Sequence, residues 1–211
     1  MKLHTFNSLL TVITLLCTGT IFAKTTPIEE YHQEIAELPI DDNLNSPEIP
    51  EKYINSALAS MGQLAAYFDT KGFKTDLSER NGLVLMITVP ASDLFAANQT
   101  ELNTSAEKIL DVFTQHLRIA DKYKLLVAVH SDGTGSEEYL NQFTQKRADA
   151  IVDWFAENEI EIGGIIPYGL GYDEPLNNDS TRKNRATNRR IEFYFIPGPK
   201  LIEQLTAKRI K

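Results

Sequence analysis

Short aliphatic runs alternate with stretches of helical period between residues 83 and 197. The apolar residues from Ala106 to Leu117 recur three or four positions apart, which predicts a helix with one buried face. The run from Lys124 to His130 is short and aliphatic, which predicts a buried strand. A second helix and two further strands follow in the same manner. We therefore expect an α/β fold, a two-layer sandwich in which the elements follow the order β-α-β-α-β-β.

A helix and the start of a β-hairpin are expected over residues 51–82, and the second strand of the hairpin begins at Leu83. Apolar residues between Ile54 and Phe68 share one helical face, and Gly72 follows where a helix would end. The pair Asn81-Gly82 supplies the positive φ angles of a tight turn between two strands. Both elements are expected to adjoin the α/β segment.

Residues 1–23 have the pattern of a secretory signal peptide. Lys2 precedes an apolar run from Leu9 to Cys17, and Ala23 stands before the polar segment that begins at Lys24. The apolar run is shorter than the roughly 20 residues of a membrane-spanning helix. We expect cleavage after Ala23 and a place in the periplasm. Lipid attachment at Cys17 and retention as a membrane anchor are the alternatives.

Charge and proline divide the rest of the chain. Residues 24–50 contain four prolines and, after Lys24, no Lys or Arg, which predicts an extended acidic linker. Residues 198–211 are expected to form a basic tail. The whole chain carries a formal net charge of −8, so we expect no nucleic-acid partner, because phosphate binding requires clustered Lys and Arg. The single cysteine excludes an internal disulfide.

Two charged residues stand out as a binding pair. Asp132 lies in a glycine-containing loop after the strand that ends at His130, and Arg147 follows fifteen residues later. An acid and a permanent cation together suit a zwitterionic ligand. If the second helix began at Thr144 as N-cap, Arg147 would lie in its first turn, close to the Asp132 loop and to unpaired backbone N–H groups. The alternative is that Asp132-Gly133 is simply a turn and Arg147 a surface residue.

Three motifs in order carry a family resemblance: His130-Ser131-Asp132-x-x-Gly135, Thr144-x-x-Arg147-Ala148 and Arg185-x-x-Asn188-Arg189-Arg190. Their sequence and spacing resemble the C-terminal domain of the OmpA family, which Pal and MotB share. The resemblance covers about residues 83–197. It implies a mixed sheet and the non-catalytic binding of peptidoglycan, which would anchor the protein or an envelope partner to the cell wall.

The resemblance also implies residue roles. Asp132 would receive the ammonium of a diaminopimelate side chain, and Arg147 would pair with its carboxylate. Polar contacts would come from Asn98 and Thr134. Five further residues would support the site: His130, Thr144, Asn188, Arg189 and Arg190. Leu140 departs from the family, which usually has asparagine there, and the lost amide would weaken or alter ligand binding.

Other classes of function fit less well. The chain has no Gly-x-Ser-x-Gly nucleophile motif and no paired-histidine metal motif, so we expect no enzyme, cofactor or metal. A membrane-anchored stator or energised-transport subunit carrying the same module is the main alternative, and a periplasmic hydrolase is a weaker one. About 60 residues lie between Ala23 and residue 83, which is too few for an eight-stranded membrane barrel. We expect a protein associated with the outer membrane or with other envelope proteins.

Overall fold

The computed structural model describes residues 26–207. The expected signal peptide, Cys17, and the last four residues of the expected basic tail lie outside the described residues. Within residues 26–207, no helix combines the length and the apolar character needed to cross a membrane.

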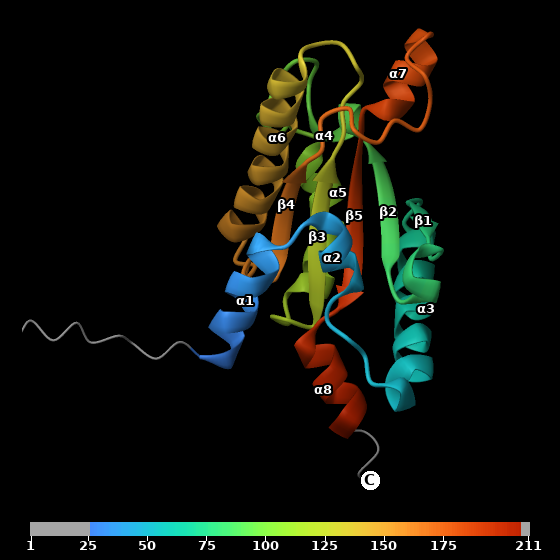
Figure 1. The fold of residues 1–211 in the computed structure, drawn as a ribbon, viewed down its shortest axis with the longest axis vertical. Helices are drawn as coiled ribbons and strands as arrows, with labels where there is room; N and C mark the ends of the chain where they lie inside the picture. Colours follow the sequence, from blue (N-terminus) through green and yellow to red (C-terminus); the bar gives the residue numbers. More distant parts are fainter. Residues whose placement is uncertain (1–25, 208–211) are drawn as a thin grey trace, which may run out of the picture.

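Five strands form one sheet in the order β1-β2-β5-β3-β4 (Figure 1). β3 and β4 are parallel, whereas the other neighbouring pairs are antiparallel. The α/β class, the mixed sheet and the order of the main elements are thereby confirmed. The strands are β1 (Lys74–Asp76), β2 (Leu85–Pro90), β3 (Tyr123–Val129), β4 (Ile165–Gly169) and β5 (Arg190–Pro197).

Three long helices cover the first face of the sheet. They bury an aromatic core in which the ring of Phe113 lies 4.5 Å from that of Phe193 and 4.9 Å from that of Phe68. Alternate strand residues such as Leu125 and Val127 point into the same cluster, as the period of a strand requires. The helices are α3 (Ile54–Thr70), α5 (Ala106–Leu117) and α6 (Glu137–Glu157).

The prediction of an extended acidic linker over residues 24–50 is wrong. Residues 27–45 form two helices, α1 (Pro27–Glu37) and α2 (Ile40–Asn45), which we call the strap. The strap covers the second face of the sheet, where Ile35 is 1% exposed and packs in one cluster with Leu126, Ala128 and Tyr194 (Figure 1). Thr26 and Glu29 form a capping box at the start of α1. Apolar burial and this cap outweigh the repulsion among the acidic side chains.

A buried polar contact fixes the strap to the sheet. The Lys124 ammonium on β3 donates to the Asn43 backbone oxygen at 2.5 Å and to its side-chain oxygen at 2.8 Å. The Asn43 amide donates in turn to the Ile35 carbonyl and to the Tyr168 hydroxyl, each at 2.6 Å. Burial, with the charge of Arg80, lowers the pKa of Lys124 to about 7. The strap is therefore held by specific hydrogen bonds as well as by apolar packing.

The expected hairpin exists, but its turn is wider than expected. β1 and β2 pair as predicted, and Asn81 and Gly82 do have positive φ. Arg80 also has positive φ, and its guanidinium donates to the Pro47 carbonyl at 2.7 Å. The connection therefore contains a wider turn, η2 (Glu79–Gly82), in which Arg80 and Asn81 have left-handed φ and ψ angles, in place of a two-residue turn.

The start of the expected basic tail is folded. It forms helix α8 (Pro199–Ala207), because Leu201 is buried in the core beneath α3. Three short helices complete the fold: η1 (Glu51–Tyr53), α4 (Ala91–Leu94) and α7 (Arg182–Asn188).

Candidate functional site

Asp132 lies in the loop that leaves β3, and its carboxylate is held from two sides. One oxygen accepts the backbone N–H of Thr134 at 3.0 Å, and the other pairs with the guanidinium of Arg189. Burial by itself would raise the pKa of Asp132. The hydrogen bonds from Thr134 and Arg189 and the charge of Arg189 outweigh that effect, so its pKa lies below the ordinary value. Asp132 is therefore an ionised acceptor at neutral pH.

Arg147 projects from α6 and is almost completely buried. Its guanidinium lies between the rings of Phe95 and Phe143, with Cζ 4.7 Å and 4.2 Å from their centroids. Nε donates to the Gln99 carbonyl at 2.8 Å, and Nη2 donates to the Ala96 carbonyl at 3.1 Å. Burial lowers its pKa to about 10, which leaves it charged at neutral pH. No hydrogen bond joins Nη1 to any described residue, so this group is available to a ligand.

The expected helix start at Thr144 is wrong. α6 begins two turns earlier at Glu137, because the side chain of Ser136 accepts the N–H of Tyr139 and caps the helix. Thr144 is instead buried inside α6. Its hydroxyl donates to the Leu140 carbonyl at 2.8 Å and accepts the N–H of Gly171 at 2.9 Å. Thr144 thus supports the site by tying α6 to the loop after β4.

A pocket of about 490 Å³ brings the expected ligand-binding residues together. Asp132, Arg147, Asn98 and Thr134 all line it. Asn98 enters the pocket from the loop after α4, where its φ of 59° is one that asparagine tolerates. Leu140 also lines the pocket and is 4% exposed, so the residue at the usual asparagine position contributes an apolar wall.

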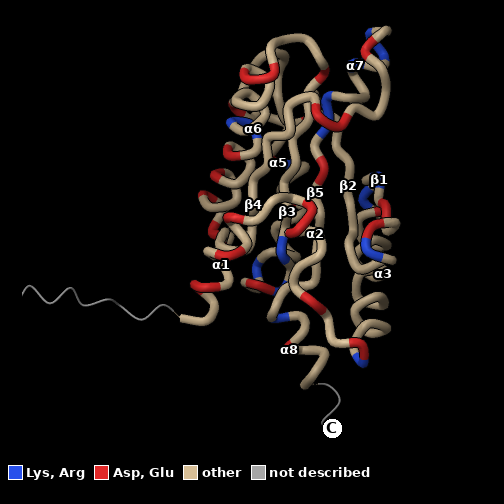
Figure 2. Tube along the Cα trace, in the orientation of Figure 1, with Lys and Arg blue, Asp and Glu red and all other residues tan. Residues whose placement is uncertain are grey.

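Three arginines near the C-terminal end of the domain complete the lining of this pocket. Arg182 and Arg185 lie on α7, and Arg189 follows that helix directly. Figure 2 shows Lys and Arg on α7, while acidic residues predominate on α6 and α1. Arg189, which we expect to support the site, pairs with the Asp132 carboxylate in the pocket, and its side chain is 42% exposed. The sequence patterns did not indicate a role for Arg182, because Arg182 is distant from Asp132 in the chain although both line the same pocket.

Residues 94–189 match the model of the OmpA family. This chain carries an OmpA family domain. The matched range contains Asn98, Asp132, Thr134, Arg147 and Arg189. The match accounts for the motifs seen in the sequence, and it leaves the strap and α3 outside the matched residues.

Several named proteins are similar over the OmpA family domain. The outer-membrane lipoprotein YfiB of Pseudomonas aeruginosa is 30% identical over 46% of this chain and 58% of its own length. The probable lipoprotein YiaD of Escherichia coli is 25% identical over 56% of this chain and 54% of its own length. The peptidoglycan-associated lipoprotein of Legionella pneumophila is 24% identical over 48% of this chain and 58% of its own length. The chain thus spans little more than half the length of these relatives.

Solved structures share the fold. A MotB-like protein from Desulfovibrio vulgaris superposes with a TM-score of 0.60 at 21% identity, covering 69% of this chain and 97% of that chain. The cell wall anchor of the T6SS from Pseudomonas aeruginosa gives a TM-score of 0.53 at 22% identity, covering 66% of this chain and 96% of that chain. Both likenesses concern the fold.

Asn188 stabilises the loop that faces Asp132 in the OmpA family domain. Its buried amide accepts the N–H of Asn177 and donates to the Asn177 carbonyl and the Asp179 carboxylate. Asp179 then accepts the N–H of Gly133 at 2.5 Å, directly beside Asp132. Asn188 therefore acts on the site through two connected loops.

His130 and Arg190 lie behind the pocket of the domain, in a buried polar cluster. Glu192 joins them, with one oxygen 3.0 Å from His130 Nε2 and the other 2.6 Å from Arg190 Nε. Tyr194 donates to the same carboxylate at 2.7 Å. Burial opposes ionisation, but these hydrogen bonds and the charge of His130 lower the pKa of Glu192 to about 2. This arrangement positions the strand ends and does not line the pocket.

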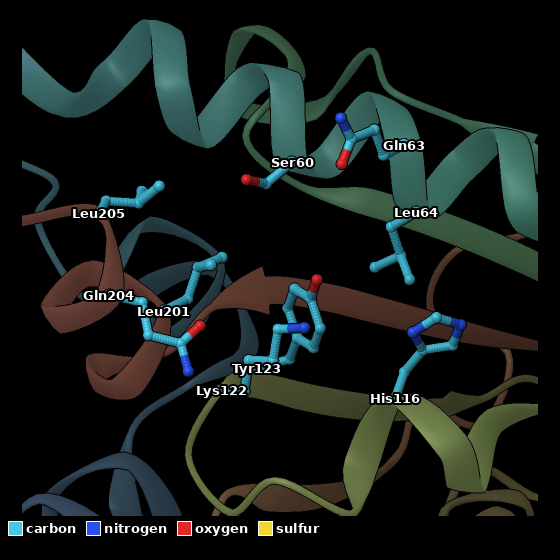
Figure 3. A pocket seen from close by; sticks show the side chains of 9 residues that line it. All are labelled: Ser60, Gln63, Leu64, His116, Lys122, Tyr123, Leu201, Gln204 and Leu205. Atoms are coloured by element: carbon cyan, nitrogen blue, oxygen red, sulfur yellow. The ribbon is translucent and has the colours of Figure 1, made fainter. Parts of the chain in front are cut away.

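A smaller cavity of about 250 Å³ lies between α3, α8 and the start of β3 (Figure 3). His116, Tyr123 and Lys122 are among its lining residues, and no carboxylate or arginine of the described chain lines it. Burial and the charge of Lys122 lower the pKa of His116 to about 4, so the imidazole is neutral near pH 7. The cavity lacks the paired opposite charges of Asp132 and Arg147 that line the larger pocket.

One group of side chains has a composition suited to a metal ion. His32, Asp121 and Glu161 place one ligand atom each within 4.8 Å of one another. His32 Nε2 already lies 2.6 Å from an Asp121 oxygen, and Glu161 accepts the N–H of Gly163 at 2.9 Å. Through these contacts, the three side chains join α1 to two loops of the domain.

Proposed function

We propose that this protein binds peptidoglycan without catalysis, through the diaminopimelate side chain of a stem peptide. The observation that carries the proposal is the convergence of an ionised, largely buried Asp132 and the accessible Nη1 of Arg147 in one pocket. Such binding would anchor the protein, or an envelope partner, to the cell wall.

The ligand and the pocket have complementary charges. The free end of diaminopimelate carries an ammonium and a carboxylate. The ammonium pairs with Asp132, and the carboxylate receives N–H donors from Arg147. Each charge-assisted hydrogen bond contributes about 1.5 to 3 kcal/mol.

Arg189 gives the site a defined ligand-free state. Its guanidinium pairs with Asp132 before a ligand arrives, as the ammonium of the ligand would do afterwards. Binding then proceeds as an exchange of ion pairs, in which the ligand's ammonium replaces Arg189 and the released Arg189 turns to the ligand's carboxylate. Because Asp132 has a cationic partner in both states, its charge is never left unpaired. The ion pair with Arg189 therefore lowers the free energy of the ligand-free protein.

A modest affinity is sufficient for this role. A single site contributing about 4 to 8 kcal/mol corresponds to millimolar to micromolar dissociation. The wall polymer displays many stem peptides close together, so a protein that dissociates rebinds nearby. The printed names of the relatives, among them a peptidoglycan-associated lipoprotein and outer-membrane lipoproteins, support a wall-binding role in the cell envelope.

Co-sedimentation with purified peptidoglycan sacculi tests the proposal. The wild-type protein is expected in the pellet, and Asp132→Asn is expected to reduce the bound fraction by about tenfold or more, since one charge-assisted contact is lost. Asp153→Asn is the matched control, because it makes the same chemical change on an exposed part of α6 outside the pocket. Wild-type protein that stays in the supernatant would overturn the proposal.

Competition identifies the bound group. Free diaminopimelate is expected to release the protein from sacculi, whereas lysine, which lacks the second carboxylate, is expected to release much less. Equal release by the two amino acids would contradict recognition through both charges. Arg147→Lys is the informative partner variant, because it keeps the positive charge and removes the planar fork of donors.

A further inference from the structure

The pocket carries more positive charge than a diaminopimelate side chain can neutralise. Four arginines line it, at positions 147, 182, 185 and 189, and Asp132 is its one acidic lining residue in the described chain. The protein as a whole has the opposite balance, with a formal net charge of −8. A concentration of arginine on an acidic protein marks a site for an anionic group.

Two of the four arginines already have roles. Arg147 holds the carbonyls of Gln99 and Ala96, and Arg189 pairs with Asp132. A zwitterionic ligand adds one negative and one positive charge, so it leaves the excess of positive charge unchanged. Arg182 and Arg185 therefore line the pocket without an anionic partner from its other lining residues or from the diaminopimelate side chain.

Arg182 and Arg185 are placed to receive that anion. Both lie on α7 and line the pocket. Arg185 is half-buried and uses Nη1 to donate to the Asp179 carbonyl at 2.7 Å, which orients its guanidinium and leaves its charge without an acid. Arg182 is exposed, and across residues 26–207 neither a carboxylate nor a carbonyl pairs with it.

We propose that Arg182 and Arg185 form a second subsite that binds another free carboxylate of the same stem peptide. This inference rests on the proposed function and extends it. Stem peptides carry such carboxylates on the acidic residue next to diaminopimelate and at the peptide end. The subsite makes the protein selective for stem peptides whose carboxylates are free, and it disfavours peptides in which they are amidated.

Binding of three synthetic stem peptides by titration calorimetry tests the subsite. The first has free carboxylates, the second is amidated on the residue next to diaminopimelate, and the third is amidated at its end. Wild-type protein is expected to bind the free peptide about three- to tenfold more tightly than one of the amidated peptides, as the loss of one partly exposed ion pair implies. The peptide that loses affinity identifies which carboxylate is bound.

Arg182→Gln and Lys183→Gln form a matched pair of variants. Both remove one exposed positive charge from neighbouring positions of α7, and Lys183 does not line the pocket. Arg182→Gln is expected to lose most of the preference for the free peptide, because only Arg185 of the subsite remains, whereas Lys183→Gln is expected to retain the wild-type difference. The difference in wild-type protein should shrink at high salt, because the ion pair is partly exposed.

The failures of the two proposals are distinguishable. If wild-type protein binds all three peptides equally, or if Arg182→Gln keeps the preference for the free peptide, the second subsite is wrong while wall binding stands. If wild-type protein binds none of the peptides and no sacculi, the proposed function and this inference both fail. Loss of binding to every peptide in Asp132→Asn, together with selectivity loss confined to Arg182→Gln, supports both.

Discussion

The guanidinium of Arg189 pairs with the carboxylate of Asp132, although 57 residues separate them in the chain. Asp132 follows β3 and Arg189 precedes β5, and these strands are neighbours in the sheet. The antiparallel pairing therefore brings an acid and an arginine to one end of the sheet, where α6 and α7 complete the pocket.

Arg189→Gln is expected to raise the pKa of Asp132. The variant removes a hydrogen bond and a positive charge that stabilise the carboxylate, and burial is then opposed only by the hydrogen bonds from Thr134. Because the pKa of Asp132 is lowered in the folded protein, its contribution to stability is present above the unfolded pKa and lost as pH falls through the folded value. In the variant this contribution should be smaller, and its loss should be complete at a higher pH.

NMR titration of the Asp132 carboxyl carbon measures this change. Arg185→Gln serves as control, because the Arg185 guanidinium donates to the Asp179 carbonyl and not to Asp132. An Asp132 pKa that is the same in wild type and Arg189→Gln would show that the ion pair is not populated in solution.

Thr144→Val is expected to destabilise the protein by about 1 to 3 kcal/mol. The substitution preserves shape but removes the hydroxyl that accepts the Gly171 N–H at 2.9 Å, leaving that buried donor unpaired. Chemical denaturation of the variant measures the free energy of unfolding. Thr187→Val is the control, since its hydroxyl is exposed and donates only to the Lys183 carbonyl on its own helix. Equal losses in the two variants would contradict a special role for the Gly171 contact.

Gly163→Ala is expected to loosen the strap without altering the pocket. A Cβ at Gly163 would lie 2.1 Å from His32 Nδ1, so the imidazole of α1 would have to move. Hydrogen exchange over residues 27–37 should accelerate by about tenfold or more, as expected for a locally weakened element. Gly164→Ala is the adjacent control, because its nearest contact would be an ordinary 3.4 Å from Asp121. Unchanged exchange in Gly163→Ala would show that His32 does not hold α1 in place.

Lys124→Met is expected to flatten the dependence of stability on pH above neutrality. The folded pKa of Lys124 is about 7, below its ordinary 10.5, so between these values the unfolded chain binds more protons than the folded one. Stability from this group therefore rises with pH in that window, by at most about 1.4 kcal/mol per pH unit. Urea denaturation of wild type and variant at pH 7 and pH 9 gives the difference. Parallel behaviour of the two proteins would mean that Lys124 titrates normally.

The fold was predictable from local patterns, because its core elements bury residues at regular spacing. The strand from Lys124 to His130 and the helix from Ala106 to Leu117 correspond closely to β3 and α5. The strap was missed because its composition is acidic and contains proline, although Thr26-x-x-Glu29 is a capping signal that the sequence displays. Its burial depends on Asn43 meeting Lys124, a contact between residues 81 positions apart.

Which residues form the candidate site was predictable from the sequence, but their arrangement in space was not. Asp132 and Arg147 line one pocket, as the motifs implied. The predicted reason for this proximity, a helix start at Thr144, was wrong, because Ser136 caps α6 and Arg147 lies almost three turns into the helix. Arg147 reaches the pocket because the loop after α4 supplies carbonyls and Phe95 to receive it. Such long-range partners have no signature in local sequence.

The position of the strap determines the direction in which an applied force would act on the protein. Helix α1 begins near one end of the sheet, and α7, which supplies two of the arginines that line the pocket, lies at the other end (Figure 1). Tension applied between the start of the strap and a ligand held in the pocket would run along the sheet. The first contacts to carry the load would be His32 with Asp121 and Asn43 with Lys124. Neither contact involves a residue that lines the pocket, so force applied to the strap would reach the pocket only through the sheet.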